Sequence, residues 1–390
     1  MTADSTTAGG GGQVLTAATV LTPDAVLSPG WVRVEGDRIT EVGDGLPPGP
    51  TGSAGRDEWV ATDLGAATLA PGFVDVHSHG GGGAAYTDGV EAAGIARAAH
   101  LAHGATSTMA SLVTDTVDRL VDQVRALAPL VACDDLLGVH LEGPWLAERY
   151  KGAHDPGLLR APSPEDVDRL IAAGPVAMVT LAPELPGASE AVRRFVEAGV
   201  LVAIGHSDAT YDQALGAFAA GARVVTHLHN AHRPIHHREP GPAQAAIDTP
   251  GVVLELIADG VHVHPAVVGA TLRTRAGRVA LVTDAMAAAG AGDGDYRLGP
   301  LTAVVRDGVA RIGGADGPIA GSTLTLDRAV RLAVARGIPL AEAVAAATRV
   351  PADLLGRPDL GRIAPGARAD LVVLDADLAV ARVMRAGHWA

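Results

Sequence analysis

The chain has 390 residues, enough for one barrel of about 250 residues and a further module. A formal net charge of −14 disfavours nucleic acid and membranes as partners, because both repel an acidic surface. Cys133 is the single cysteine, so no intramolecular disulfide can form. With no signal-peptide pattern and no long apolar run, a cytoplasmic location is expected.

The first part of the sequence predicts a tail followed by β-structure. Residues 1–12 are mostly Ser, Thr, Ala and Gly, which indicates a disordered tail. From residue 13 to about 69, short alternating stretches predict strands, and residues 31–39 (WVRVEGDRI) fit a β-hairpin with a Gly-Asp turn. Residues 43–55 are rich in Gly and Pro, as loops are.

From residue 70, short apolar runs alternate with Ala-rich segments of helical spacing, such as 190–198 and 212–220. Eight runs are strand candidates: residues 73–77, 106–112, 136–142, 177–182, 201–205, 223–227, 252–258 and 279–284. Repeated strand–helix alternation predicts a closed parallel (β/α)₈ TIM-like barrel. An open doubly wound sheet is the alternative, weakened because no Gly-rich nucleotide fingerprint follows the first strand.

The last part of the chain predicts two helices and then further strands. Helical patterns cover residues 326–336 and 340–350, and residues 369–374 and 379–385 alternate like strands. The simplest assembly combines residues 13–69 and 366–390 in a small β-sandwich domain. The barrel, residues 70–365, would then be inserted between the two halves of that domain.

Six of the predicted barrel strands end in residues that can bind metal or transfer protons. His77 and His79 are two apart on a strand and therefore face the same side. The other ends carry Glu142, His206, His227, His262 and Asp284. Alone, each is more often a surface, capping or N-cap residue. In a barrel, all of them would meet on the active-site face. Burying each of them there without a partner would cost roughly several kcal/mol. A metal ion bound by these residues is the simplest explanation of how that cost is avoided.

Imidazole and carboxylate ligands suit Zn²⁺, with Fe²⁺, Mn²⁺ or Co²⁺ as alternatives. Such an ion polarises carbonyl groups and lowers the pKa of bound water to about 7. Asp284 then has an evident role: it can accept the proton of the water and transfer it to a leaving amine.

The strand ends belong to a longer series of motifs. In order, these are PGFVDVHSHG (71–80), HLEGPW (140–145), KGAH (151–154), TLAPE (180–184), GHSDA (205–209), THLHNA (226–231), REPG (238–241), ADGVH (258–262), LVTDA (281–285) and GSTLT (321–325). Over residues 70–365 the chain resembles the amidohydrolase superfamily and, within it, the amino-sugar phosphate deacetylases. The resemblance implies hydrolysis of the acetamide of N-acetyl-D-glucosamine 6-phosphate to D-glucosamine 6-phosphate and acetate.

The resemblance also implies roles for individual residues. Metal ligands map to Glu142, His206 and His227, and the intact His77 and His79 are similar to members that bind two ions rather than one. Catalytic roles map to Asp284, as acid and base, and to His154. Substrate contacts map to Ala153, His154, Asn230, Ala231, Arg238, Asp259, His262, Ile319, Ala320 and Gly321. Arg238 suits a phosphate and in such proteins can act across a homodimer interface.

Other members of the superfamily bridge two ions with a carboxylated lysine on the fourth strand, but Lys151 is the only lysine and residues 176–182 contain none. Residues 232–237 (HRPIHH) are richer in histidine than expected, which leaves substrate preference open. Two alternatives remain: a deacetylase of another N-acetylhexosamine phosphate, such as the galactosamine epimer, and a non-catalytic sugar-phosphate sensor. Retention of Asp284 with the ligand set disfavours the sensor.

Overall fold

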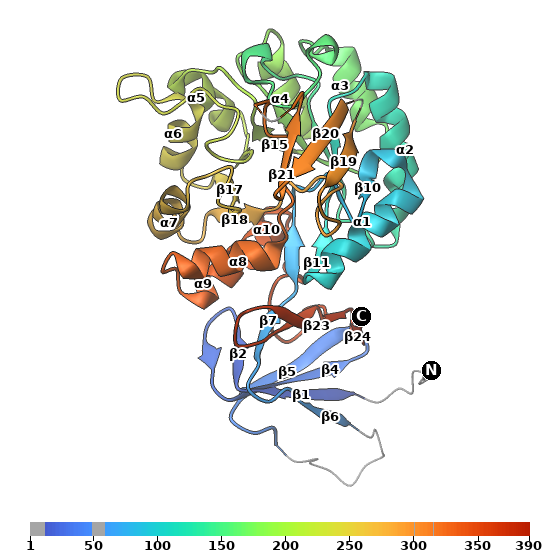
Figure 1. Ribbon diagram of the computed structural model, residues 1–390, viewed down its shortest axis with the longest axis vertical. Coiled ribbons are helices and arrows are strands. Elements are labelled where there is room, and N and C mark those ends of the chain that lie inside the picture. Colours follow the sequence, from blue (N-terminus) through green and yellow to red (C-terminus); the bar gives the residue numbers. More distant parts are fainter. Residues whose placement is uncertain (1–11, 49–58, 300, 315) are drawn as a thin grey trace.

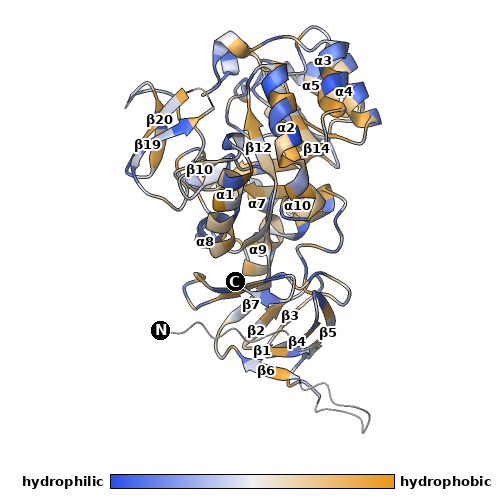
Figure 2. Cartoon of the chain, turned by 90° about the vertical axis from the view of Figure 1, so that its right-hand side faces the viewer, coloured by the Kyte–Doolittle hydropathy of each residue, from blue (hydrophilic) through white to orange (hydrophobic). Residues whose placement is uncertain are grey.

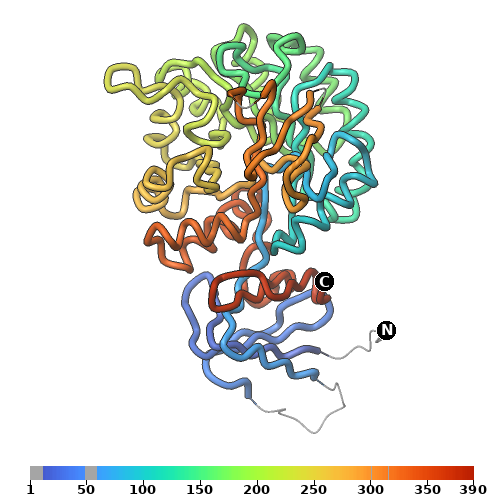
Figure 3. Tube along the Cα trace, viewed as in Figure 1, coloured from blue at the N-terminus to red at the C-terminus, as the bar shows by residue number. Residues whose placement is uncertain are grey.

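The computed structural model describes residues 12–48, 59–299, 301–314 and 316–390. The predicted tail, apart from residue 12, and residues 49–55 of the predicted loop lie outside the described residues. Figures 1 and 3 show a larger body of helices around a central set of strands, and a smaller body of strands below it. Among the described helices, none combines the length and apolar character needed to cross a membrane.

The larger body is a parallel barrel. Its strands are β8 (Phe73–Asp75), β11 (Ala105–Thr108), β12 (Ala110–Val113), β13 (Val139–Glu142), β14 (Val176–Leu181), β15 (Leu201–Ile204), β16 (Val224–Val225), β17 (Val253–Ile257) and β18 (Val279–Val282). They pair in the order β12 to β18, and β8 pairs with β11. The circle closes where Asp284 N–H donates to His77 O at 2.8 Å and Ser78 bridges to Ala285. The predicted barrel is confirmed, and the open sheet is wrong.

Two predicted strands depart most from the observed ones. The run 106–112 is divided at Met109, whose N–H donates across to Asp75 O at 2.8 Å, so β11 pairs with β8 while β12 pairs with β13. The run 223–227 is strand only at Val224–Val225, because the backbone turns at His227, where φ is +31°. Met109 packs inside the barrel with Met178, Ala203 and Val224, whereas the turn at His227 lies at the barrel mouth.

Helices surround the barrel and fill its base. They are α1 (Val90–Ala102), α2 (Val117–Ala132), α3 (Pro164–Ile171), α4 (Ala188–Glu197), α5 (Tyr211–Ala219), α6 (Gly241–Asp248), α7 (Pro265–Thr274), α8 (Leu326–Ala335), α9 (Leu340–Ala347) and α10 (Arg349–Leu354). Side-chain caps mark the starts of some of these helices; Thr210 and Gln213, for example, form a capping box at α5. The helix predicted over 340–350 is interrupted at Thr348 and becomes α9 and α10.

The smaller body is a sandwich of two sheets from both ends of the chain. One sheet contains β1 (Gln13–Ala17), β4 (Gly30–Glu35), β5 (Arg38–Asp44) and β6 (Val60–Asp63); the other contains β2 (Thr19–Leu21), β3 (Val26–Leu27), β7 (Thr68–Pro71), β22 (Leu371–Leu374), β23 (Val380–Arg385) and β24 (His388–Trp389). Buried side chains such as Leu15, Val32, Leu69 and Leu371 fill the space between them. The predicted hairpin is β4–β5, turning at Gly36 with φ of +55°.

A separate three-stranded sheet, absent from the sequence prediction, follows β18. It contains β19 (Gly294–Leu298), β20 (Leu301–Arg306) and β21 (Val309–Ile312), and Figure 2 shows it projecting at the side of the barrel. Leu298, Ala303 and Val305 pack with Val113 and Met286 of the barrel mouth in a small apolar cluster. This packing places the sheet beside the carboxyl ends of the barrel strands.

Candidate metal centre and substrate cavity

Three of the predicted site residues stand at strand ends in a strained backbone conformation. His206, His227 and Asp284 have φ of +48°, +31° and +48°, a region that residues with a side chain rarely adopt. Each such residue costs roughly 1–3 kcal/mol, and cost of this kind concentrates at functional sites. The turns direct the side chains to the mouth of the barrel, where all three residues are buried.

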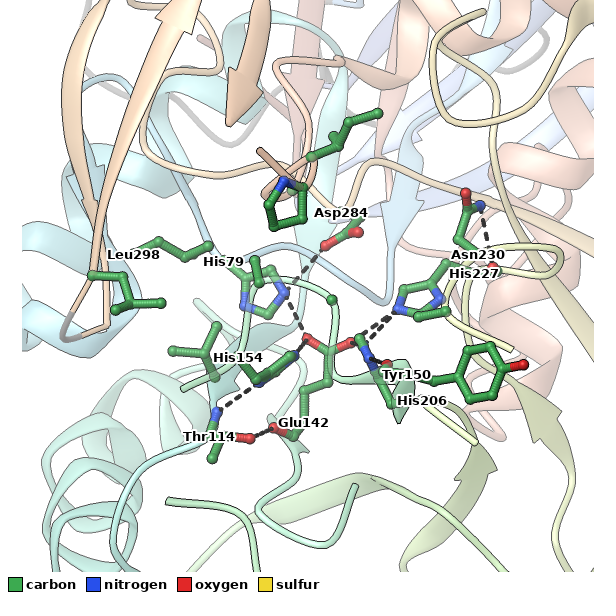
Figure 4. A pocket seen from close by; sticks show the side chains of 18 of the residues that line it. His79, Thr114, Glu142, Tyr150, His154, His206, His227, Asn230, Asp284 and Leu298 are labelled. Carbon is green, nitrogen blue, oxygen red and sulfur yellow. Dashed lines mark hydrogen bonds and ion pairs between the residues drawn. The ribbon is translucent and has the colours of Figure 1, made fainter. Parts of the chain in front are cut away.

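Glu142 lies between two pairs of imidazoles, of which His79, His206 and His227 are labelled in Figure 4. Its Oε2 atom is 3.1 Å from His79 Nε2 and 3.7 Å from His77 Nε2, and its Oε1 atom is 3.0 Å from His206 Nε2 and 3.1 Å from His227 Nε2. Within the pairs the Nε2 atoms face each other at 3.2 Å and 3.1 Å. Two ring nitrogens that both present lone pairs repel at this distance unless a proton or a cation lies between them.

An acceptor fixes the far nitrogen of three of these rings. The Nδ1 contacts are Glu255 Oε2 at 3.0 Å for His77, the Ser111 carbonyl at 3.1 Å for His79 and the Tyr150 carbonyl at 2.8 Å for His206. These oxygens can only accept, so Nδ1 carries the proton and Nε2 of the neutral ring presents its lone pair to the centre. The buried donor set therefore fits a divalent cation.

The rings of the centre differ in their electrostatics, most clearly His79 and His206. Burial disfavours a charged imidazole throughout the centre, but hydrogen bonds with Asp284 and Glu142 outweigh it at His79 and raise its pKa to about 9. At His206 burial prevails and lowers the pKa to about 4. The carboxylates that favour a proton on His79 would equally favour a cation in its place, whereas His206 is a neutral imidazole.

His154 lies in the same cluster with a different hydrogen-bond pattern. The backbone N–H of Thr114 donates to His154 Nδ1 at 3.4 Å, so in the neutral ring Nε2 carries the proton and faces Glu142 Oε2 at 3.5 Å. Among the described residues, two groups have ligand atoms within 4.8 Å of one another: His77, His79 and Glu142, and Glu142, His154 and His206. The tautomer distinguishes His154 from the other rings as a hydrogen-bond donor.

A cavity of about 370 Å³ opens beside Glu142. The predicted site residues that line it are His79, Glu142, Ala153, His154, His206, His227, Asn230, Ala231, His262, Asp284, Ile319 and Gly321. Gly321 has φ of +62°, and a Cβ atom there would lie 3.0 Å from Asp284 O, so this segment packs closely against the Asp284 turn. The volume suits a small polar molecule, and polar groups surround it on several sides.

Other predicted residues lie outside the cavity lining. Asp259 accepts from His262 Nδ1 at 2.6 Å; burial opposes its ionisation, but His262 keeps its pKa below the usual value. Ala320 is fully buried behind the lining. Arg238 is exposed, with Nη1 2.6 Å from His237 Nε2, in the segment between β16 and α6. His77 is fully buried behind His79.

Several residues of the site were not predicted from the sequence. Arg149, Tyr150, Thr114, Leu298 and Leu301 also line the cavity. Thr114 directly follows β12, and Leu298 and Leu301 belong to the unpredicted β19–β21 sheet, so only the fold brings these three residues there. Glu255 had a usable signal, a lone carboxylate within the apolar strand 252–258.

Fold and centre together define a (β/α)₈ barrel protein with buried histidines and carboxylates, compatible with a divalent metal, where its strands end. The sequence profile of the Amidohydrolase family matches residues 68–390. The chain belongs to this family.

Known proteins resemble it over most of its length. N-acetylgalactosamine-6-phosphate deacetylase of Escherichia coli O157:H7 is 38% identical, covering 84% of this chain and 89% of that protein. N-acetylglucosamine-6-phosphate deacetylase of Vibrio furnissii is 35% identical, covering 84% of each. The structure of the Mycobacterium smegmatis N-acetyl-D-glucosamine-6-phosphate deacetylase, a mutant in complex with N-acetyl-D-glucosamine-6-phosphate, is 49% identical with a TM-score of 0.92, covering 97% of this chain and 99% of that one.

Proposed function

We propose that this protein hydrolyses the acetamide of N-acetyl-D-glucosamine 6-phosphate to D-glucosamine 6-phosphate and acetate. The observation that carries the proposal is the convergence of Glu142, four histidines and Asp284 on one side of a cavity large enough for a sugar phosphate. Relatives that act on N-acetylated amino-sugar phosphates share the family and nearly the whole length of the chain. A cytoplasmic location is part of the same proposal.

Glu142, His206 and His227 would hold one divalent ion, and Glu142 with His77 and His79 a second. We propose Zn²⁺, with Fe²⁺, Mn²⁺ and Co²⁺ as alternatives, because imidazole and carboxylate donors dominate the set. When bound, such an ion polarises the amide carbonyl and acidifies water. The Nδ1 acceptors Glu255, Ser111 and Tyr150 keep the ligand rings oriented.

Asp284 would act as the general base and then as the general acid. Burial by itself would raise its pKa, but His77 and His79 keep the pKa well below the usual value, so the group is a carboxylate able to accept a proton. Its Oδ1 atom lies 3.2 Å from His79 Nε2 beside the cavity. From there it can take a proton from the attacking water and deliver it to the leaving nitrogen.

Other residues would orient the sugar. His154 can donate from Nε2, and His262, held by Asp259, presents its ring to the cavity. Asn230 and Ala231 line the side from which the segment with Arg238 departs, and we propose that they bind the phosphate. Because Arg238 is exposed and outside the cavity of its own chain, we propose a homodimer in which it reaches the site of the partner.

The experiment is acetate release by the purified protein, with N-acetylglucosamine 6-phosphate and N-acetylgalactosamine 6-phosphate in parallel and metal content measured on the same sample. We expect turnover of the glucosamine substrate that chelation removes and a divalent ion restores. Preference for the galactosamine epimer, whose deacetylase in Escherichia coli O157:H7 is 38% identical, would replace the substrate but keep the reaction. Binding without turnover in a metal-loaded sample would favour the sugar-phosphate sensor.

A further inference from the structure

Glu255 is a buried carboxylate behind the metal centre, on the apolar strand β17. Its side chain has no exposed surface. Oε2 accepts from His77 Nδ1 at 3.0 Å and from the backbone N–H of His227 at 3.3 Å. Oε1 has no hydrogen-bond partner among the described residues. A charged group placed this way costs free energy unless its interactions recover that cost, so its position requires an explanation.

The partner of His77 differs in kind from those of the neighbouring rings. His79 and His206 donate from Nδ1 to backbone carbonyls, whereas His77 donates to a carboxylate. A carbonyl dipole and a full negative charge both fix the tautomer, but the charge makes Nε2 a stronger donor to a cation. Of the three rings whose Nδ1 is held, only His77 receives this support.

The two contacts of Oε2 reach both halves of the centre. His77 belongs to the pair on the Oε2 side of Glu142, and His227 to the pair on the Oε1 side. His227 has its backbone in the left-handed region, with φ of +31°, and its N–H would be buried without a partner if Glu255 were apolar. One side chain therefore holds a ring in the first pair and a strained turn in the second.

We infer that Glu255 is a positioning residue for metal: it orients His77, so that the position formed by His77, His79 and Glu142 holds an ion in addition to the one held by His206, His227 and Glu142. The inference rests on the proposed metal-dependent function and deepens it. Glu255 touches neither the cavity nor the reacting atoms. Its effect is on how tightly the second ion is bound.

The experiment counts ions per chain. Full-length wild-type protein, Glu255→Gln and Glu255→Leu are stripped with a chelator, reloaded with Zn²⁺, and compared by mass spectrometry of the metal and by calorimetric titration. Wild type is expected to hold two ions. Glu255→Gln keeps an acceptor oxygen without the charge and should weaken one of the two ions roughly 10- to 100-fold, a common effect of changing the hydrogen-bond partner of a ligand. Glu255→Leu should hold one ion.

Asp327→Asn is the matched control, because Asp327 is also buried but lies on the outer helix α8 beside Arg331 and His103. It should keep two ions. Two ions of unchanged affinity in Glu255→Leu, or one ion in wild type, would overturn the inference and leave the deacetylase proposal intact. If Glu255→Leu does not fold, the affinity of Glu255→Gln decides. A wild-type protein that deacetylates without any metal would instead overturn the proposed function.

Discussion

The two ends of the barrel both bury charge, but they arrange it differently. At the amino end, Arg368 is 5% exposed and donates from Nε to Asp370 Oδ2 at 2.9 Å and from Nη2 to Ser107 at 2.6 Å, with Asp134 paired to it as well. Every contact there joins a donor to an acceptor. At the carboxyl end, imidazole nitrogens face one another at 3.1–3.2 Å around Glu142.

The difference separates stability from function. The amino-end cluster is complete in itself and joins the residues just before β22 and the α2–β13 loop to β11, so it should contribute to the stability of the fold. The carboxyl-end cluster needs a proton or a cation between its facing ring nitrogens, and it includes strained residues that a purely structural role would not need. A substitution at the carboxyl end should therefore lower activity without unfolding the protein. A substitution at the amino end should lower the free energy of unfolding without changing kcat.

Removal of metal should have the largest effect. We expect chelation to abolish deacetylation of N-acetylglucosamine 6-phosphate. Without the ion, the paired nitrogens and Glu142 cannot polarise the amide carbonyl or acidify the attacking water. Acetate release before and after chelation, and after return of Zn²⁺, measures this. Full activity in a sample shown by mass spectrometry to be free of metal would contradict it.

Asp284→Asn should have the second-largest effect on activity. Loss of general acid–base catalysis lowers kcat by roughly 10²–10⁴-fold, while the protein stays folded and keeps metal on Glu142, His206 and His227. Steady-state kinetics with metal analysis on the same preparation test this. Asp248→Asn, on the exposed side of α6, is the control and should match wild type. Unchanged turnover in Asp284→Asn would exclude the proposed base.

Arg368→Met tests the opposite end. Breaking a buried ion pair leaves Asp370 without its partner and should lower the free energy of unfolding by about 3–5 kcal/mol. The midpoint of urea unfolding measures the loss, and kcat of the folded variant should not change. Arg194→Met removes an exposed pair with Asp168 and should cost less than about 1 kcal/mol. Equal losses in the two variants would remove the distinction between these sites.

Arg238→Ala should have the smallest effect. Loss of a charged hydrogen bond to phosphate, worth about 1.5–3 kcal/mol, should raise KM for the phosphorylated substrate roughly 10- to 100-fold and change kcat little. Exposed Arg125 of α2 provides the control, Arg125→Ala. An equal loss with unphosphorylated N-acetylglucosamine would argue against a phosphate contact.

The proposed homodimer has a separate test. Sedimentation of wild-type protein should give the mass of a dimer.

Local patterns predicted the barrel because each strand carries its own signal, an apolar run that in six of the eight cases ends in a residue able to bind metal or transfer a proton. His77, His206 and His227 could be found this way, since a barrel brings all carboxyl ends of its strands together. The β19–β21 sheet could not be found, because its cluster with Val113 depends on contacts distant in sequence. Likewise, no local pattern links Glu255 to His77, 178 residues away.

The sandwich has a consequence for the order of events during synthesis. β7, which leads directly into the barrel, pairs on one side with β2 and on the other with β22. Residues 371–374 leave the ribosome after all the barrel strands, so one edge of β7 has no neighbour while the barrel forms. An unpaired strand edge is a site of aggregation. A chain that stops before β22 would keep this edge open permanently, so the last few strands protect the newly made protein as well as completing its smaller body.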